Sequence, residues 1–196
     1  MRDHDVRDAL RRKVFAEHIR DPNTLVVEEL GIAHGEVRVD IAVINGRFHG
    51  FEIKSDADTL YRLPAQMAIY NAVFDRVTIV VGHRHLAHVT TAAPSWWGIK
   101  AALSGKRGAI RFDEVRQPKT NPGIDPKSLA TLFWRDEAIA FLEARGERGI
   151  KSKTRAQLCE IIADRVPLLD LRQGVRNTLK ARAGWRSDAQ RVPCAG

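Results

Sequence analysis

The chain has 196 residues, of which 44% are hydrophobic, so we expect one medium domain, or one domain with a small appendage. It contains no apolar stretch long enough to cross a membrane, and no apolar segment follows the charged N-terminus, so we expect neither a membrane span nor a signal peptide. Cys159 and Cys194 are too few for a disulfide framework. A reduced, cytoplasmic protein is therefore expected.

The positive charge is concentrated in the C-terminal half of the chain. The first 99 residues contain 12 basic and 13 acidic side chains, and the remaining residues contain 20 basic and 11 acidic side chains. The formal net charge of +8 therefore comes from residues 100–196. A basic half favours a polyanionic partner such as nucleic acid, although ordinary solubility explains the charge equally well.

Hydrophobic periodicity predicts alternating helices and strands in the first 115 residues. The expected elements are a helix at 5–20, strands at 24–28, 36–44 and 47–54, a helix at 59–74, and strands at 76–81, 96–101 and 109–115. A segment with three prolines and a glycine follows and indicates a linker. Beyond it the pattern is helical, at 128–145, 154–165 and 168–182. The fold class is α/β with a C-terminal all-helical appendage.

These elements suggest four segments along the chain. We expect an α/β domain at 1–115, a linker at 116–127, a basic helical region at 128–191 and a tail at 192–196.

The two long strands make a prediction about the turn between them. If Asn45-Gly46 formed a two-residue hairpin, Asp40 would face away from Glu52, against the hydrophobic pattern of both strands. We therefore predict a three-residue connection or a bulge between Ile44 and Gly50. In that register the odd positions enter the core and four polar residues share the other face: Arg38, Asp40, Glu52 and Lys54.

Asp40 and the Glu52-Ile53-Lys54 triplet suggest metal-assisted phosphodiester hydrolysis. Two carboxylates can hold Mg²⁺, which polarises a phosphate and lowers the pKa of a bound water. A lysine beside them can orient that water or offset phosphoryl charge. The alternative is that these residues form the polar outer face of a hairpin.

The following helix adds Gln66 and Tyr70, which are four residues apart and share one helix face near Lys54. Tyr70 also belongs to an apolar stripe with Met67 and Phe74, so core packing is an equally good explanation. The two roles can coexist.

With these motifs, residues 5–82 resemble the PD-(D/E)xK nuclease superfamily, in the RecB-like branch with a QxxxY motif. The resemblance implies a restriction-endonuclease-like core, which is a helix, a three-stranded meander, a helix and a strand. It also implies a Mg²⁺- or Mn²⁺-dependent deoxyribonuclease that hydrolyses DNA. Asp40 and Glu52 would bind the metal, Lys54 would position water, and Gln66 and Tyr70 would support the site or touch the DNA backbone.

The family pattern leaves two points open in this sequence. Val39 precedes Asp40 where relatives often have proline. Relatives also often have one more acidic residue upstream, for which Glu17, Glu28 and Glu29 are candidates. We favour Glu29 as the further metal ligand, because it ends a short strand.

A second candidate surface lies on the last helix. Arg172, Arg176 and Lys180 recur every four residues and form a basic stripe that could follow phosphates, or be an ordinary solvated face. His83, His85 and His88 also cluster, but a solvated loop or helix start is favoured over a zinc site.

Three functional hypotheses follow. The first is the metal-dependent nuclease, and the second is a catalytically inactive nuclease-fold module that binds nucleic acid or belongs to a larger complex. The third is an interaction protein whose helical tail docks a protein partner, which would leave the apolar stripe from Leu168 to Leu179 exposed. The pattern makes no prediction of oligomeric state.

Overall fold

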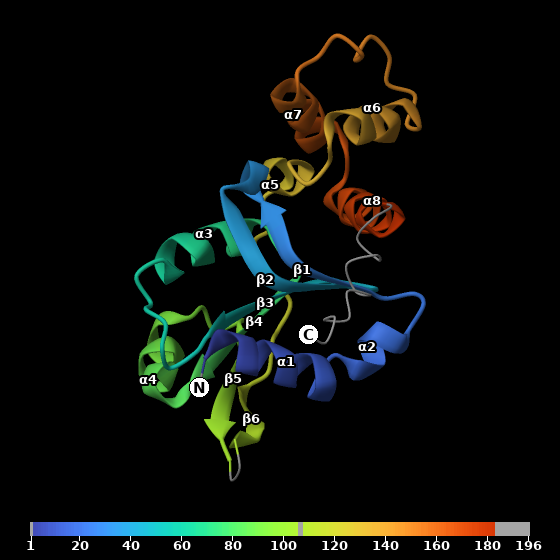
Figure 1. Cartoon of the computed structure of the whole chain (residues 1–196). Helices are drawn as coiled ribbons and strands as arrows, with labels where there is room; N and C mark the ends of the chain where they lie inside the picture. The colour runs from blue at the N-terminus through green and yellow to red at the C-terminus, as the bar shows by residue number, and fades with distance from the viewer. Residues whose placement is uncertain (1, 106–107, 183–196) are drawn as a thin grey trace, which may run out of the picture.

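A computed structural model describes residues 2–105 and 108–182 of the chain (Figure 1). The predicted tail at 192–196, Cys194 and the end of the predicted basic region lie outside the described residues. The first half contains α1 (Asp3–Lys13), α2 (Ala16–Arg20), β1 (Leu25–Ile32), a 3-10 turn η1 (Ala33–Gly35), β2 (Val37–Ile44), β3 (Phe48–Lys54), α3 (Leu63–Val73), β4 (Arg76–Gly82), α4 (His83–Ala92) and β5 (Gly98–Ser104). It is followed by β6 (Ile110–Arg116), α5 (Pro126–Ala130), α6 (Arg135–Glu143), α7 (Arg155–Arg165) and α8 (Leu168–Ala181).

The strands form one six-stranded sheet in the order β1-β2-β3-β4-β5-β6, which confirms the α/β class. The pairs β1–β2, β2–β3 and β5–β6 are antiparallel, whereas β3–β4 and β4–β5 are parallel. The two parallel pairs each need a crossover, and α3 and α4 provide them.

Two predicted helices are divided in the structure, and one observed helix was not predicted. The helix expected at 5–20 is divided into α1 and α2, with the buried Phe15 between them. The helix expected at 128–145 is also two helices, α5 and α6. The crossover α4 was expected only as a loop or helix start, and it buries His85 and Val89 against the sheet domain.

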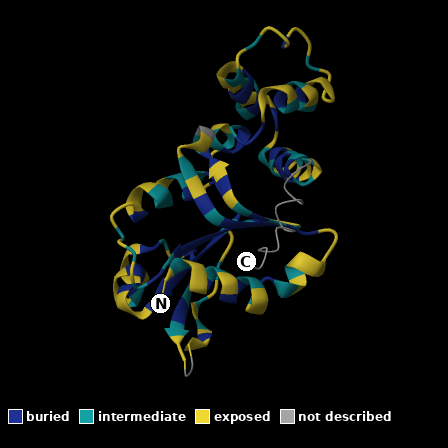
Figure 2. Ribbon diagram, in the orientation of Figure 1, coloured by how far each residue is buried: buried dark blue, intermediate teal, exposed yellow. Residues whose placement is uncertain are grey.

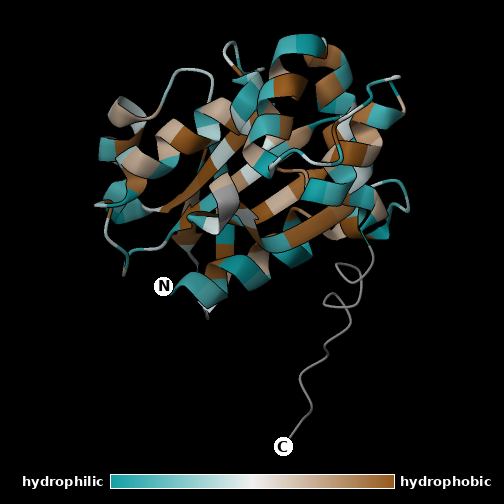
Figure 3. Ribbon diagram, turned by 90° about the horizontal axis from the view of Figure 1, so that it is seen from above, coloured by the Kyte–Doolittle hydropathy of each residue, from teal (hydrophilic) through white to brown (hydrophobic). Residues whose placement is uncertain are grey.

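Apolar residues cover both faces of the sheet (Figures 2 and 3). On one face α1 packs against Ile41, Val43, Phe51 and Ile53. On the other face α3 and the C-terminal helices share a larger cluster that includes Ala42, Ile44 and Phe48. The prediction that the odd positions of β2 and β3 enter a core is confirmed for Val39, Ile41, Val43, Phe51 and Ile53. The expected polar opposite face is wrong for Ala42 and Ile44, because helices bury both faces of the sheet.

The C-terminal helices pack directly on the sheet. The apolar stripe of α8 belongs to the same cluster as the strands, and Leu171, Val175 and Leu179 are buried. The exposed stripe that the interaction-protein hypothesis requires is therefore not present. The predicted linker is also in contact with the sheet domain, since Asn121 donates hydrogen bonds to the carbonyl oxygens of Asn71 and Phe74.

None of the helices in the described ranges is both long and apolar enough to span a membrane.

Candidate functional site

The connection between β2 and β3 places Asp40 opposite Glu52. Ile44 pairs with Phe48, so three residues connect the strands, as the alternation predicted. Regular pairing ends at Ile41 and Phe51. The next residues in this register are Asp40 and Glu52, and they lie where the two strands stop pairing.

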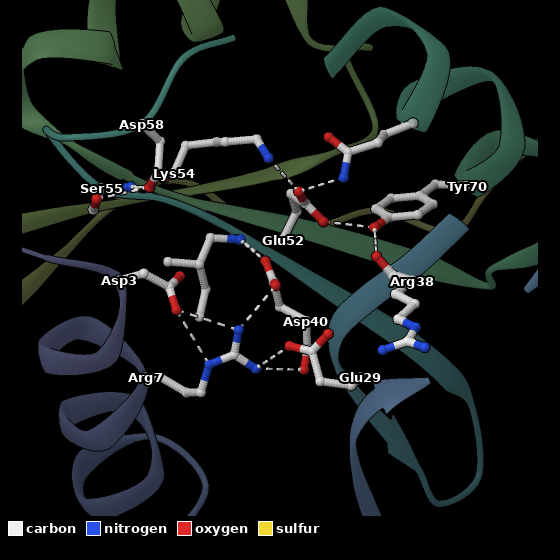
Figure 4. Close-up of polar contacts among 12 residues, drawn as sticks. Asp3, Arg7, Glu29, Arg38, Asp40, Glu52, Lys54, Ser55, Asp58 and Tyr70 are labelled. Atoms are coloured by element: carbon white, nitrogen blue, oxygen red, sulfur yellow. Dashed lines mark hydrogen bonds and ion pairs between the residues drawn. The ribbon is translucent and has the colours of Figure 1, made fainter. Parts of the chain in front are cut away.

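The Glu52 carboxylate is buried and accepts hydrogen bonds on both oxygens (Figure 4). Lys54 Nζ and Gln66 Nε2 each lie 2.6 Å from Glu52 Oε1, and the Tyr70 hydroxyl lies 2.5 Å from Oε2. Only 1% of Glu52 is exposed, so the alternative of a polar outer face is wrong for this residue. The structure therefore brings together Glu52, Lys54, Gln66 and Tyr70.

Tyr70 has both of the roles expected of it. Its ring is fully buried, edge-on to Phe74 at 5.4 Å between centroids and stacked on Trp97 at 6.0 Å. Its hydroxyl contacts Glu52 and lies 3.2 Å from the carbonyl oxygen of Arg38. Burial, and then the negative charge of Glu52, raise the pKa of Tyr70. The phenol therefore remains protonated and acts as a donor.

Asp40 has a separate set of partners. Its Oδ2 accepts a hydrogen bond from the backbone N–H of Ile53 at 2.7 Å, and its Oδ1 lies 3.0 Å from Arg7 Nη2. Burial, and then the negative charge of Glu52, raise the pKa of Asp40 to about 7. The two carboxylates are thus close enough to repel each other, although Asp40 is held by α1 and Glu52 by α3, which cover opposite faces of the sheet.

Arg7 is the site residue that the sequence analysis missed. Its guanidinium contacts the carboxylates of Asp40 and Glu29, the latter at 2.9 Å, and a weaker contact reaches Asp3 at 3.4 Å (Figure 4). Arg7 Nη1 also donates to the carbonyl oxygen of Asp40 at 3.0 Å. The only local signal is the four-residue spacing of Asp3 and Arg7, which is common on helix surfaces.

Among the upstream glutamates, Glu29 lies nearest to Asp40 in the sheet register. Its neighbours Glu28 and Leu30 pair with Ile41 and Val39, which places Glu29 opposite Asp40. Its φ of 53° is in the left-handed region, which is uncommon for a residue with a side chain.

The other two upstream glutamates lie elsewhere. Glu28 pairs with Arg11 at 2.8 Å, and Glu17 lies on α2. Within residues 2–105 and 108–182, no three His, Cys, Asp or Glu side chains gather as a metal-binding group. Glu29 therefore meets Asp40 through Arg7 and does not form a common ligand set with Asp40 and Glu52.

The basic stripe of α8 is not a solvated surface. Arg172 and Arg176 pair with the buried Asp75 at 2.7 and 3.3 Å, and only 9% of Arg176 is exposed. Lys180 Nζ donates to the carbonyl oxygen of Asn23 at 2.6 Å. The expectation of a phosphate-tracking stripe is corrected accordingly, because these groups attach α8 to the sheet domain.

The comparisons with known proteins give one family and one structural likeness. Protein cII of Enterobacteria phage P4 is 24% identical over 182 residues, which span 93% of this chain and 68% of that protein. Among solved structures, SPO1766, a protein of unknown function from Silicibacter pomeroyi, is 23% identical with a TM-score of 0.42. The match covers 70% of this chain and 89% of the SPO1766 chain. The family described as Bacteriophage P4 protein cII matches residues 6–190. The chain therefore belongs to the bacteriophage P4 protein cII family.

Proposed function

We propose that this protein is a metal-dependent deoxyribonuclease with a restriction-endonuclease-like core of the PD-(D/E)xK type. The observation that supports the proposal is the buried Glu52, which accepts hydrogen bonds from Lys54, Gln66 and Tyr70 and lies opposite Asp40. A buried carboxylate is costly unless it is paired, and functional sites are where such groups concentrate. Four of the motif residues thus share contacts at Glu52, whereas Asp40 lies beside them in the strand register and is held by Arg7.

In this proposal the two carboxylates share one divalent cation. Mg²⁺ is commonly held by one or two protein carboxylates, with waters and substrate oxygens completing the shell. Burial, and then repulsion by Glu52, raise the pKa of Asp40, and a bound cation would offset both effects. Asp40 and Glu52 would hold the ion, which would polarise the phosphate and lower the pKa of a bound water.

The remaining residues would position the water and the Glu52 carboxylate and would offset negative charge. Lys54 lies on the same strand as Glu52, and its ammonium can hold the attacking water by a hydrogen bond or offset phosphoryl charge. Gln66 and Tyr70 each bind a different oxygen of Glu52, which fixes the orientation of the carboxylate. They are positioning residues in this proposal.

The test is a cleavage assay on linear, single-stranded and branched DNA with Mg²⁺, Mn²⁺ or EDTA. We expect metal-dependent cleavage by the wild type and a loss of at least about a hundredfold in Glu52→Gln and Lys54→Met. The matched controls are Glu114→Gln and Lys100→Met, because these residues form a 3.0 Å ion pair between β5 and β6. Cleavage by the Glu52 and Lys54 variants at the wild-type rate would contradict the site assignment.

A second candidate function is a catalytically inactive nuclease-fold module that binds nucleic acid, alone or as a subunit of a larger complex. The observation that favours it is Arg7, which already forms ion pairs with Asp40 and Glu29. A permanent internal cation could take the place of a metal. Salt-sensitive DNA binding without cleavage of any substrate, and no heat of Mg²⁺ or Mn²⁺ binding in calorimetry, would favour this function over the nuclease.

A further inference from the structure

Arg62 extends the row of α3 residues that contact Glu52. Arg62, Gln66 and Tyr70 are spaced four residues apart, so they follow one face of the helix. Gln66 and Tyr70 use this face to bind Glu52, and Arg62 continues it by one turn, at the N-terminal end of the helix. Arg62 is exposed, and its side chain has no hydrogen-bond or ion-pair partner in the described part of the chain.

Arg38 lies on a different side of the same carboxylates. It precedes Asp40 by two residues on β2, and its carbonyl oxygen accepts the Tyr70 hydroxyl. Figure 4 shows its side chain pointing away from Lys54. Within the described ranges this side chain is also exposed and without a polar partner. Two free arginines thus flank the carboxylates from separate elements.

The charge of the site explains why such arginines matter. Four carboxylates gather there, those of Asp3, Glu29, Asp40 and Glu52. Among the described residues, two cations, Arg7 and Lys54, form ion pairs with them. A phosphate backbone that approaches this group is repelled unless cations line its path. Exposed guanidinium groups can line this path, since each one can bind two oxygens of a phosphate group at once.

Tyr61 adds a base-sized flat surface next to Arg62. It is 91% exposed, which is more than Leu169 at 72% or Trp134 at 54%, and Arg182 already covers the Trp134 ring. An aromatic ring left almost entirely in water beside a free arginine fits stacking on a nucleobase. The bases of a duplex are already stacked on each other, so only an unpaired base can use this ring.

We propose that Tyr61, Arg62 and Arg38 bind single-stranded DNA where it crosses the candidate site. Tyr61 stacks on an unpaired base, and the two arginines contact phosphates on either side of the Glu52 carboxylate. This inference rests on the proposed function in one respect: it takes the same site and names its substrate as an unpaired DNA strand.

The test is binding in EDTA of fluorescently labelled oligo-dT and of a duplex hairpin of equal length, followed by anisotropy. We expect the wild type to bind oligo-dT more tightly than the hairpin. Tyr61→Ala should weaken oligo-dT binding about tenfold with little effect on the hairpin, whereas Tyr61→Phe should bind within about twofold of the wild type.

The arginines are tested through the salt dependence of the same binding. Arg62→Ala and Arg38→Ala should each reduce the slope of log affinity against log salt by about 0.7, which is the contribution of one phosphate contact on a single strand. Arg47→Ala is the matched control, because Arg47 is exposed at the β2–β3 connection, at the other end of both strands. Its slope should equal that of the wild type.

Three outcomes would overturn the inference. They are no oligo-dT binding by the wild type, equal effects of Tyr61→Ala on both probes, and slopes for Arg62→Ala and Arg38→Ala equal to that of Arg47→Ala. The measurement contains no metal, so it is separate from the cleavage assay. Binding that depends on Tyr61, without cleavage in Mg²⁺ or Mn²⁺, would support this inference and contradict the nuclease.

Discussion

The Tyr70 hydroxyl donates a 2.5 Å hydrogen bond to Glu52 Oε2, and this contact joins the core of the protein to its candidate site. The ring of Tyr70 is buried against Phe74 and Trp97, while its oxygen reaches a carboxylate on β3. Packing therefore fixes the ring, and the fixed ring fixes one oxygen of Glu52. This geometry separates the structural role of Tyr70 from its positioning role.

Tyr70→Phe tests the positioning role directly. The variant keeps the buried ring and loses the hydrogen bond to a charged group, which costs about 1–3 kcal/mol of stabilisation at Glu52. We expect cleavage to fall at least about tenfold, with the variant still folded by circular dichroism. Tyr70→Ala should instead lower the melting temperature strongly, because it leaves a cavity. Wild-type cleavage by Tyr70→Phe would mean that only the ring matters.

The stability of the metal-free protein should depend on the ionisation of Asp40. Its folded pKa of about 7 exceeds the value near 4 of an unfolded aspartate, so the folded state holds this proton more tightly. The stabilisation is fully present below about pH 4 and is lost as the pH rises through about 7. Asp40→Asn has no titrating group at this position, so its free energy of unfolding should not show this decrease.

Urea denaturation in EDTA across this pH range measures the Asp40 effect. The free energy of unfolding of the wild type should fall relative to that of Asp40→Asn as the pH rises. Parallel curves for the two proteins would show that the pKa of Asp40 is not raised.

Arg7→Ala should raise the pKa of Asp40 above its wild-type value. The positive charge of Arg7 opposes the effects of burial and of Glu52 on this carboxyl group. Titration of the side-chain carboxyl carbons by NMR, in EDTA, measures the change. Arg11→Ala is the matched control, because Arg11 lies on the same helix but pairs with Glu28. The same pKa in all three proteins would exclude an electrostatic role for Arg7.

Asp75→Asn should destabilise the attachment of α8 to the sheet. Asp75 is 5% exposed and pairs with Arg172 and Arg176, so its neutralisation leaves a buried arginine without its counterion. Breaking such a pair costs about 3–5 kcal/mol. The exposed pair of Arg111 and Asp113 provides the control, since Asp113→Asn should cost less than about 1 kcal/mol. Equal midpoints for the two variants in urea would contradict this role of Asp75.

The local sequence pattern was sufficient to predict the features that depend on residues close together in the chain. The strict alternation of β2 and β3 predicted the three-residue connection, because a one-residue slip would have moved every side chain to the other face. The spacing of Gln66 and Tyr70 likewise predicted a shared helix face, and both residues contact Glu52. The candidate carboxylates and lysine were identified from these periodicities and from the resemblance.

Contacts between distant segments were decided only by the tertiary structure. Arg7 meets Asp40 across 33 residues of chain, and Arg176 meets Asp75 across 101 residues. Helical spacing showed that Arg172, Arg176 and Lys180 share a face, but not that this face lies against the sheet domain. A hydrophobic period specifies which side of an element is buried, whereas the partner of a charged side chain depends on how the elements pack. The sequence by itself thus determined the β2–β3 register and the residues that contact Glu52. Packing added Arg7 to the site and decided which basic residues are free to meet a ligand.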